Sequence, residues 1–428
     1  MCQPFIDLGL SATIAQQLQH IGFQSPTEIQ SRAIPAILSG DDLLACAQTG
    51  TGKTAAFGLP LIQKLLSRDA STETVTENQN SAGHVFSLIL VPTRELAQQV
   101  FDNLCQYSQG QAIKVAVVYG GTSMRVQTQQ LKSGVDILVA TPGRLLDHLH
   151  CRHVSLKQTE YLVFDEADRM LDMGFMPDIQ RITKRLPAQR QTLLFSATLD
   201  NRIKALAHRI MNQPRSIEVS PPNQTAVTVK QIVYPVDKKR KRELLSHLIG
   251  SRNWRQVLVF TKTKSGSDDL AQQLKLDGIK AVSINGDKSQ GARLRALDQF
   301  RNGEVRALIA TDVAARGLDI PQLEQVVNFD MPYKAEDYIH RIGRTGRAGS
   351  EGLAVSLMCR EEEPLLQAVE RLLDERLPQE WLAGYEPGTL PPMHDDRPVK
   401  RQSRSAEKRK MKARLKIHSG RGKHGRKK

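Results

Sequence analysis

Three carboxylates lie within four residues of the chain, at Asp165, Glu166 and Asp168. They directly follow the apolar, β-favouring run 161–164. Like charges this close repel one another, so such a cluster usually has a cation or another compensating partner beside it. Taken alone, the pattern also fits a solvated turn after a buried strand. A phosphate-binding loop elsewhere in the chain would favour a site over a turn.

The segment 47–54, AQTGTGKT, has the features of such a loop. An apolar run precedes it, and the helix-forming stretch AAFGLPLIQKLL follows it. In this arrangement backbone N–H groups and the helix N-terminus face phosphates, Lys53 reaches the outer phosphates, and the Thr54 hydroxyl takes Mg²⁺. The first glycine of the general pattern is Ala47 here. Beside such a loop, Asp165 can hold Mg²⁺ through water, and Glu166 can orient and deprotonate an attacking water.

Phosphoryl transfer also needs positive charge opposite the leaving group. The segment 340–347, HRIGRTGR, supplies Arg341, Arg344 and Arg347 at intervals of three residues. This segment lies far downstream of the loop, so hydrolysis would require two parts of the chain to close on one another. A basic helix end is the alternative interpretation, and these residues alone do not decide between the two.

The elements that must position these residues are short apolar runs separated by helix-period segments, which is typical of a parallel sheet covered on both faces. In such sheets ligands bind beyond the carboxyl ends of the strands, where the polar motifs fall. The alternation breaks at 214–230, which contains three prolines, and restarts without a second glycine-rich loop. We therefore predict two α/β domains, 1–213 and 231–376, joined by a linker at 214–230 with a cleft between them.

The formal net charge of +15 is concentrated at the C-terminal end of the chain. Fifteen Lys or Arg residues and one acid, Glu407, fall between Arg397 and Lys428. Such a block cannot bury enough apolar surface to fold alone, so we predict a disordered basic tail at 377–428. Its expected partner is a nucleic-acid backbone, because neutralised phosphates release counterions. A merely solubilising tail is the alternative.

The remaining composition points to an intracellular setting. No run approaches the roughly eighteen apolar residues of a membrane span, and no basic and apolar leader opens the sequence. We therefore expect no membrane association and a cytoplasmic location. The five cysteines have no paired spacing, so we expect reduced thiols and neither a zinc site nor a disulfide framework.

Together these motifs resemble those of the DEAD-box ATP-dependent RNA helicases, over about residues 5–373. The resemblance implies two tandem RecA-like α/β domains, and the stretches VDKKRKRELLSHLIG and GDKSQGAR further resemble the bacterial RhlE-type branch. The motifs that carry the family resemblance, in chain order, are GFQSPTEIQ (22–30), AQTGTGKT (47–54), PTRELAQQ (92–99), the Gly120-Gly121 pair, TPGR (141–144), DEAD (165–168), SAT (196–198), VLVFTKT (257–263), ATDVAARGLD (310–319) and HRIGRTGR (340–347).

The resemblance implies an ATP site whose adenine-reading segment spans 3–31. Gln30 would read adenine with its amide, which favours ATP over GTP because guanine offers two acceptors at those positions. Phe5 would stack on the base, Asp319 would contact the ribose, and Arg344 and Arg347 would reach the γ-phosphate. The full nucleotide-binding set is then Phe5, Gln30, Ala47, Gln48, Thr49, Gly50, Thr51, Gly52, Lys53, Thr54 and Asp319, with Thr54 and Asp165 for Mg²⁺ and with Lys53, Asp165, Glu166, Arg344 and Arg347 as the catalytic groups.

The resemblance also implies a residue set that couples ATP to RNA and an RNA-binding surface across both domains. The coupling set is Asp168, Ser196, Thr198 and His340. Most of the RNA-binding positions are small residues or backbone donors in loops, which suits contact with phosphates and 2′-hydroxyls without reading of sequence. These positions are Pro92, Thr93, Arg94, Gly121, Thr141, Gly143, Gln290, Arg293 and Thr311.

The expected function is an RNA-dependent ATPase that unwinds or remodels short RNA duplexes as a monomer, in ribosome assembly or RNA turnover on structured or ribosomal RNA. An RNA-binding or annealing chaperone that works mainly through the basic tail, with ATP regulating its grip, is the first alternative. A DNA-directed helicase of the same superfamily is the second.

Overall fold

The computed structural model describes residues 3–47, 50–71, 84–219, 229–315, 323–346 and 352–388. Most of the predicted basic tail and part of the predicted linker therefore lie outside the described residues. Within these ranges no helix has the length and hydropathy that crossing a membrane requires.

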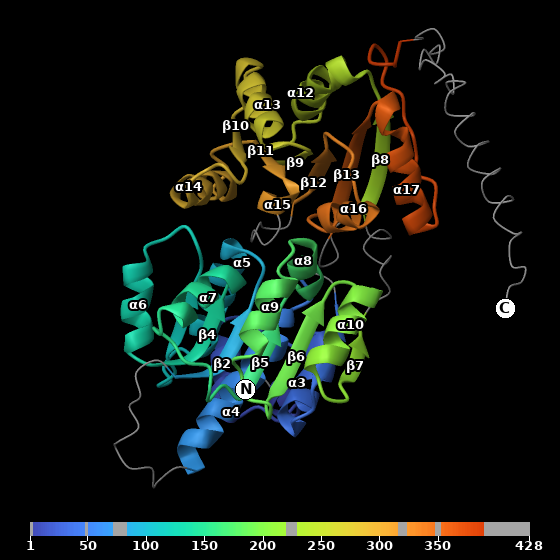
Figure 1. Ribbon diagram of the computed structural model, residues 1–428. Coiled ribbons are helices and arrows are strands. Elements are labelled where there is room, and N and C mark those ends of the chain that lie inside the picture. The colour runs from blue at the N-terminus through green and yellow to red at the C-terminus, as the bar shows by residue number, and fades with distance from the viewer. Residues whose placement is uncertain are drawn as a thin grey trace, which may run out of the picture. The chain divides into compact units, whose positions relative to one another are not determined.

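The first domain contains a parallel sheet of seven strands in the order β3-β4-β2-β5-β6-β1-β7 (Figure 1). Six of the seven strands follow from apolar runs, the exception being the edge strand β7, and helices cover both faces. The strands are β1 (Leu43–Cys46), β2 (Val85–Leu90), β3 (Val115–Val118), β4 (Val135–Ala140), β5 (Tyr161–Phe164), β6 (Gln191–Ser196) and β7 (Arg215–Glu218). The helices are α1 (Gln3–Ile6), α2 (Ala12–His20), α3 (Glu28–Ser39), α4 (Lys53–Ser71), α5 (Arg94–Tyr107), α6 (Met124–Lys132), α7 (Pro142–His150), α8 (Ala167–Asp172), α9 (Met176–Thr183) and α10 (Asn201–Ile210).

Two hydrophobic layers hold this sheet, because successive side chains of a strand point to opposite faces. In β6, Leu193 and Phe195 pack on one face with α2 to α5, whereas Leu194 packs on the other face with α7 to α10. This two-sided burial explains why the strands read as continuous apolar runs without polar alternation.

The second domain contains a parallel sheet of six strands in the order β10-β11-β9-β12-β13-β8. Its strands are β8 (Val229–Pro235), β9 (Val257–Thr261), β10 (Ala281–Ile284), β11 (Ala307–Thr311), β12 (Gln325–Asn328) and β13 (Gly352–Met358). Its helices are η1 (Lys238–Arg240), α12 (Lys241–Ser251), α13 (Lys264–Leu276), α14 (Gln290–Arg301), α15 (Asp312–Ala315), α16 (Ala335–Ile342), η2 (Arg360–Glu362) and α17 (Glu363–Leu373). The prediction of two α/β domains with helix-covered parallel sheets is confirmed.

Two predicted boundaries differ from the structure. Residues Arg215–Glu218, placed in the linker, form strand β7 beside β1, and Val229 already begins β8. The prolines that suggested a linker at 214–230 flank this edge strand on both sides. Edge strands tolerate such breaks because only one of their sides is hydrogen-bonded to a neighbour.

The predicted tail also begins too early, because the chain stays packed on the second domain up to about Glu386. Leu377 is buried, Gln379 forms a bridge to Val233, and the Tyr234 hydroxyl donates to Glu380. Tyr385 packs against His247 of α12 with 5.4 Å between ring centroids. This stretch lacks helical or strand periodicity, so the sequence gives no sign that it packs against the domain.

Candidate active site

The predicted phosphate loop and the acidic cluster meet at one edge of the first sheet. Strands β5, β6 and β1 are neighbours and parallel, so the loops that follow them leave from the same edge. These loops carry the DEAD segment, the SAT segment and the phosphate loop, in that order. Topology therefore brings together residues that lie far apart in the sequence.

The phosphate loop leads directly into α4, whose first residue is Lys53. The Lys53 side chain is almost fully buried, and its Nζ donates to the carbonyl of Ala47 at 3.0 Å. Gly50 and Gly52 have φ of 83° and 88°, a region that favours glycine. A Cβ on Gly52 would lie 2.3 Å from Gln30 Nε2, so a larger residue there would displace the Gln30 amide. Gln48 and Thr49 lie outside the described residues.

Gln30 connects the predicted adenine-reading segment to this loop. Its amide oxygen accepts from the Thr27 N–H at 3.0 Å, and its amide nitrogen donates to the Gly52 carbonyl at 3.1 Å. The Thr27 hydroxyl donates to the Thr51 carbonyl at 2.8 Å. A primary amide has two donors and two acceptor lone pairs, so one of each remains for a base. Adenine reading by Gln30 stays a prediction.

Phe5 does not have the setting that base stacking requires. Its side chain is fully buried and packs edge-on against Phe23, with 5.9 Å between ring centroids. Phe23 is half-buried and packs in the same way on Tyr107. Phe5 is therefore part of the core that α2 to α5 form on the sheet. The apolar spacing of FIDLGL, which suits a core contact, was the signal against stacking.

Asp165 and Glu166 end β5 in a nearly dry environment. Burial raises the pKa of Asp165 to about 6, although the nearby Lys53 opposes this shift and Glu166 adds to it. Burial also disfavours the charged form of Glu166, but Arg169, Lys53 and Arg344 together hold the pKa of Glu166 below its usual range. Glu166 Oε2 is buried, lies 3.7 Å from Arg169 Nη1 and accepts no hydrogen bond. The charge of Asp165 is thus incompletely compensated by nearby cations. Glu166 is ionised, and its Oε2 can still accept a hydrogen bond.

The backbone of Glu166 is unusual as well. Its φ is 54°, in the left-handed region, where a residue with a Cβ is strained. Asp165 accepts a hydrogen bond from the Glu166 N–H at 3.0 Å across this turn. The conformation turns the chain sharply from β5 into α8 and keeps both carboxylates at the strand end.

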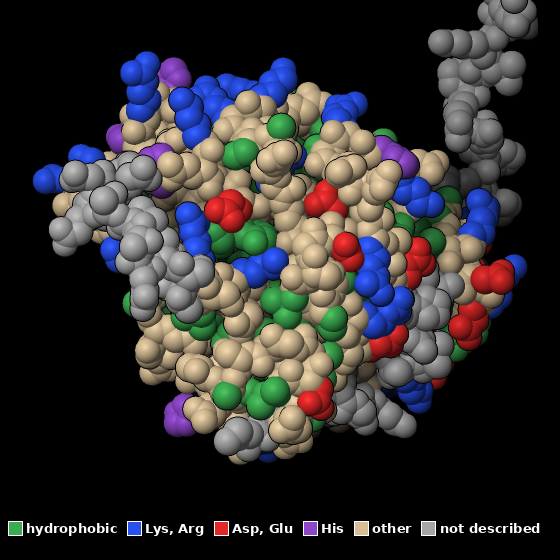
Figure 2. Space-filling view, turned by 90° about the horizontal axis from the view of Figure 1, so that it is seen from below, with side chains coloured by type: hydrophobic (Ala, Val, Ile, Leu, Met, Phe, Trp, Pro, Cys, Tyr) green, Lys and Arg blue, Asp and Glu red, His purple; other side chains and the backbone are tan. Residues whose placement is uncertain are grey.

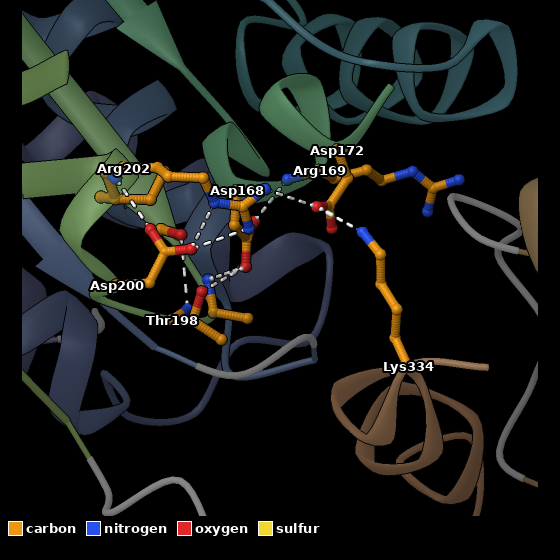
Figure 3. Close-up of polar contacts among 10 residues, drawn as sticks. Asp168, Arg169, Asp172, Thr198, Asp200, Arg202 and Lys334 are labelled. Carbon is orange, nitrogen blue, oxygen red and sulfur yellow. Dashed lines mark hydrogen bonds and ion pairs between the residues drawn. The ribbon is translucent and has the colours of Figure 1, made fainter. Parts of the chain in front are cut away.

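Asp168 lies against the SAT segment after β6 (Figure 3). Its Oδ2 accepts from the Ala197 N–H at 3.2 Å and from the Thr198 hydroxyl at 3.3 Å. The Ser196 hydroxyl accepts from the Thr198 N–H at 3.3 Å, so Ser196 acts on Asp168 through Thr198. The structure thus joins the predicted coupling residues of the first domain into one network.

The second domain contributes Arg344 and His340, which line a small pocket together with Glu166, Asp168 and Arg169. Arg341 has a different role, because its side chain is buried and forms a double ion pair with Asp312 at 2.6 and 2.7 Å. Of the three arginines, Arg341 therefore holds the domain together and Arg344 faces the carboxylates. Arg347 and Asp319 lie outside the described residues.

The predicted RNA-binding positions of the first domain lie in the loops after β2, β3 and β4. Thr93 caps α5, and Arg94 begins that helix. A Cβ on Gly121, whose φ is 81°, would lie 1.9 Å from Arg94 Nη1, so Gly121 makes room for this guanidinium. Thr141 caps α7, and the space around Gly143 is open. The remaining position, Pro92, is buried before α5.

Among the predicted positions of the second domain, Gln290 begins α14 and Thr311 ends β11. Arg293 forms an ion pair with Glu95 of the first domain at 2.9 Å, and both side chains are nearly buried. Sequence reasoning missed Glu95 and likewise Arg169. Glu95 lies inside the quoted motif PTRELAQQ next to Arg94, and Arg169 directly follows the DEAD segment, so these positions were the available signal.

A phosphate loop in one parallel α/β domain and an arginine supplied by a second such domain define a two-domain P-loop nucleotide hydrolase. Family comparison makes this more specific. Residues 27–206 match the DEAD/DEAH box helicase family, and residues 240–349 match the helicase conserved C-terminal domain. The chain belongs to the DEAD-box ATP-dependent RNA helicases.

Curated relatives and solved structures agree with this assignment. The ATP-dependent RNA helicase CshA of Listeria monocytogenes is 42% identical over 373 residues, which covers 87% of this chain and 69% of that protein. CshA of Bacillus subtilis is 40% identical over 373 residues, which covers 87% of this chain and 73% of that protein. The predicted RhlE-type branch stays a prediction, because these relatives are named CshA.

Solved structures of the family share the tandem RecA-like fold. Dbp5 of S. cerevisiae bound to RNA and ADP BeF3 is 30% identical with a TM-score of 0.76, over 88% of this chain and 95% of that one. Mss116 bound to single-stranded RNA and UDP-BeF is 29% identical with a TM-score of 0.75, over 89% and 79%.

Proposed function

We propose that this RNA helicase couples magnesium-dependent ATP hydrolysis to the local separation of short RNA duplexes. The observation that carries the proposal is the setting of Glu166. Its carboxylate faces Lys53 and Arg169 of its own domain and Arg344 of the second domain. A group that receives positive charge from both domains suits a reaction that proceeds only when the two domains meet.

The residues at the strand ends fit Mg-ATP. Lys53 would hold the outer phosphates, and Thr54 and Asp165 would hold the metal, partly through water. A bound magnesium ion supplies positive charge to the phosphate oxygens. The fit rests on Asp165, whose buried carboxylate has a raised pKa because its charge lacks sufficient compensation. A divalent cation beside Asp165 would remove that penalty.

Glu166 would act as the base. Its lowered pKa keeps it ionised at neutral pH, and its buried Oε2 is free to accept a proton from water. Arg344 would stabilise the charge that develops on the departing phosphate. RNA would influence this step through Asp168, because its contacts with Ala197 and Thr198 join the catalytic turn to the segment after β6.

The Glu166→Gln variant tests this proposal. The amide keeps the size and hydrogen-bonding capacity of the side chain but cannot accept a proton, so nucleotide binding should remain while turnover falls by at least about 100-fold. Nucleotide binding is measured by equilibrium titration and turnover by phosphate release with saturating RNA. Full ATPase activity in this variant would refute the role of Glu166, and Glu160→Gln, an exposed position just before β5, provides a matched glutamate-to-glutamine control.

We further propose that the protein acts as a cytoplasmic monomer on structured or ribosomal RNA, in ribosome assembly or RNA turnover. The basic segment 397–428 supports general affinity for RNA and gives no address. Phosphate release with ribosomal RNA, generic duplex RNA and DNA, each with and without that segment, tests the substrate class. Equal stimulation by DNA would favour a DNA-directed helicase instead.

The charge of the same segment favours a second candidate, an RNA-annealing protein in which ATP only regulates grip. If the tail is an anchor for the helicase, its removal should weaken RNA binding. It should also reduce the slope of log affinity against log salt concentration by about 0.9 for each phosphate contact with a duplex that is lost. Turnover at saturating RNA should survive. Loss of all RNA remodelling with intact turnover would instead favour the annealing function.

A further inference from the structure

We propose that Asp172 and Lys334 form an interdomain latch that aligns Arg344 with Glu166 for hydrolysis. Lys334 Nζ donates to Asp172 Oδ1 at 3.0 Å, from the second domain to the first (Figure 3). Neither residue belongs to the nucleotide-binding, coupling or RNA-binding sets described above. Both are positioning residues in this proposal, which rests on the proposed roles of Glu166 and Arg344.

The placement of the four residues on two helices carries the inference. On α8, Glu166 is the N-cap and Asp172 is the last residue. On α16, Lys334 is the N-cap, and Arg344 follows just beyond the last residue, Ile342. Each helix therefore has a reacting group near one end and a latch group near the other. A contact at Arg344 alone would leave α16 free to pivot, whereas a second contact at Lys334 fixes its direction.

Asp172 is also held by its own domain. Its Oδ1 also accepts from Arg202 Nη1 at 3.0 Å (Figure 3). Arg202 is in turn paired with Asp200 at 2.7 Å, and Asp200 caps α10 by accepting from the Ile203 N–H at 2.8 Å. The first domain thus presents a carboxylate of fixed orientation. The Asp172 side chain therefore loses little additional conformational entropy when Lys334 binds it.

Exposure distinguishes this contact from the interdomain ion pair between Glu95 and Arg293. Glu95 and Arg293 are nearly buried, with side-chain exposures of 7% and 12%, whereas Lys334 is 55% and Asp172 23% exposed. A half-exposed pair is weak, reversible and sensitive to salt. Such properties suit a latch that must open after each turnover, and they limit the expected effect to a few-fold.

The test compares Lys334→Ala and Lys334→Arg in the full-length protein. Lys334→Ala should lower kcat at saturating ATP and RNA by roughly twofold to fivefold, the range of an exposed ion pair, and leave KM for ATP unchanged. Lys334→Arg keeps the charge and should restore kcat. Because salt already screens the latch, the difference between wild type and Lys334→Ala should shrink as salt rises.

A double-mutant cycle with Asp172→Asn separates the latch from a purely structural role of Asp172. If the two residues act on one another, the double variant should be no slower than Asp172→Asn alone. Arg242→Ala, which removes an ion pair with Asp277 inside the second domain, is the control and should leave kcat unchanged.

Additive effects in the cycle, no rescue by arginine or an unchanged kcat in Lys334→Ala would overturn the latch. Failure of the proposed function has a different signature, because Arg344→Ala would then retain full turnover.

Discussion

Replacing Asp165 with asparagine should stabilise the nucleotide-free protein while abolishing its activity. The carboxylate is 3% exposed, and burial raises its pKa from 3.8 to about 6. Because the raised pKa belongs to the folded state, the unfolded chain loses this proton at a lower pH. Stability is therefore greatest below pH 4 with respect to this group and falls as pH rises towards 6. Above that pH the ionised carboxylate remains as a constant cost.

The shift from 3.8 to about 6 sets the size of this cost. At roughly 1.4 kcal/mol for each pKa unit, it amounts to about 3 kcal/mol at pH 7.5 and about half of that at pH 5. Asparagine carries no charge and can still accept from the Glu166 N–H, as Asp165 does. In a domain of this size, 3 kcal/mol corresponds to an increase of roughly 6 to 12 °C in Tm.

The assay is thermal unfolding of both proteins in EDTA at pH 5.0 and pH 7.5, with phosphate release in magnesium as the activity measurement. Asp172→Asn, at the last residue of the helix that follows Asp165, is the matched control. Partial burial raises the pKa of Asp172, but the hydrogen bonds and ion pairs with Lys334 and Arg202 outweigh this effect and lower it. Replacing Asp172 with asparagine should therefore destabilise the folded protein at pH 7.5. A lower Tm for Asp165→Asn at pH 7.5, or a gain that does not depend on pH, would refute the reasoning.

Three further predictions test the corrections and the RNA-binding surface. Phe5→Leu should keep ATP affinity near wild type and cost little stability, whereas Phe5→Ala should lower the free energy of unfolding in urea by about 3 to 5 kcal/mol. Loss of ATP affinity in a well-folded Phe5→Leu protein would instead support the stacking role. Gly121→Ala should displace Arg94 and weaken RNA binding at least several-fold in fluorescence titration, with nucleotide binding unchanged; wild-type RNA affinity would exclude Arg94 from the interface. Truncation after residue 376 should lower the Tm of the second domain by several degrees, because it removes the packed segment that includes Leu377. Truncation after residue 388 should leave the Tm unchanged. Equal Tm values for the two truncated proteins would show that this segment is not part of the domain.

Much of the fold and much of the site were readable from local sequence. Apolar runs predicted strands because both faces of a parallel sheet are buried, and AQTGTGKT predicted a phosphate loop because few sequences combine those backbone and side-chain requirements. The boundaries were less predictable. The strand Arg215–Glu218 and the packed segment around Tyr385 have weak patterns of their own and gain their structure from β1 and α12.

The roles of single side chains divided along the same line. The arginine spacing in HRIGRTGR could not tell Arg341, which is buried against Asp312, from Arg344, which faces Glu166. A buried structural arginine and an arginine that faces the site look the same in the sequence, because burial and the identity of the partner depend on distant strands.

The sequence by itself therefore predicted the chemistry that this protein has available: a lysine and a threonine for phosphates and a metal, two carboxylates that act through water, and arginines that supply positive charge. Only the tertiary structure decided which of these groups face one another. Strand order places β5, β6 and β1 side by side, and the contact between Lys334 and Asp172 joins groups that no local pattern relates. The physical reason is that residue type and spacing dictate local conformation, whereas burial, pKa and partner choice arise from packing between elements distant in the chain.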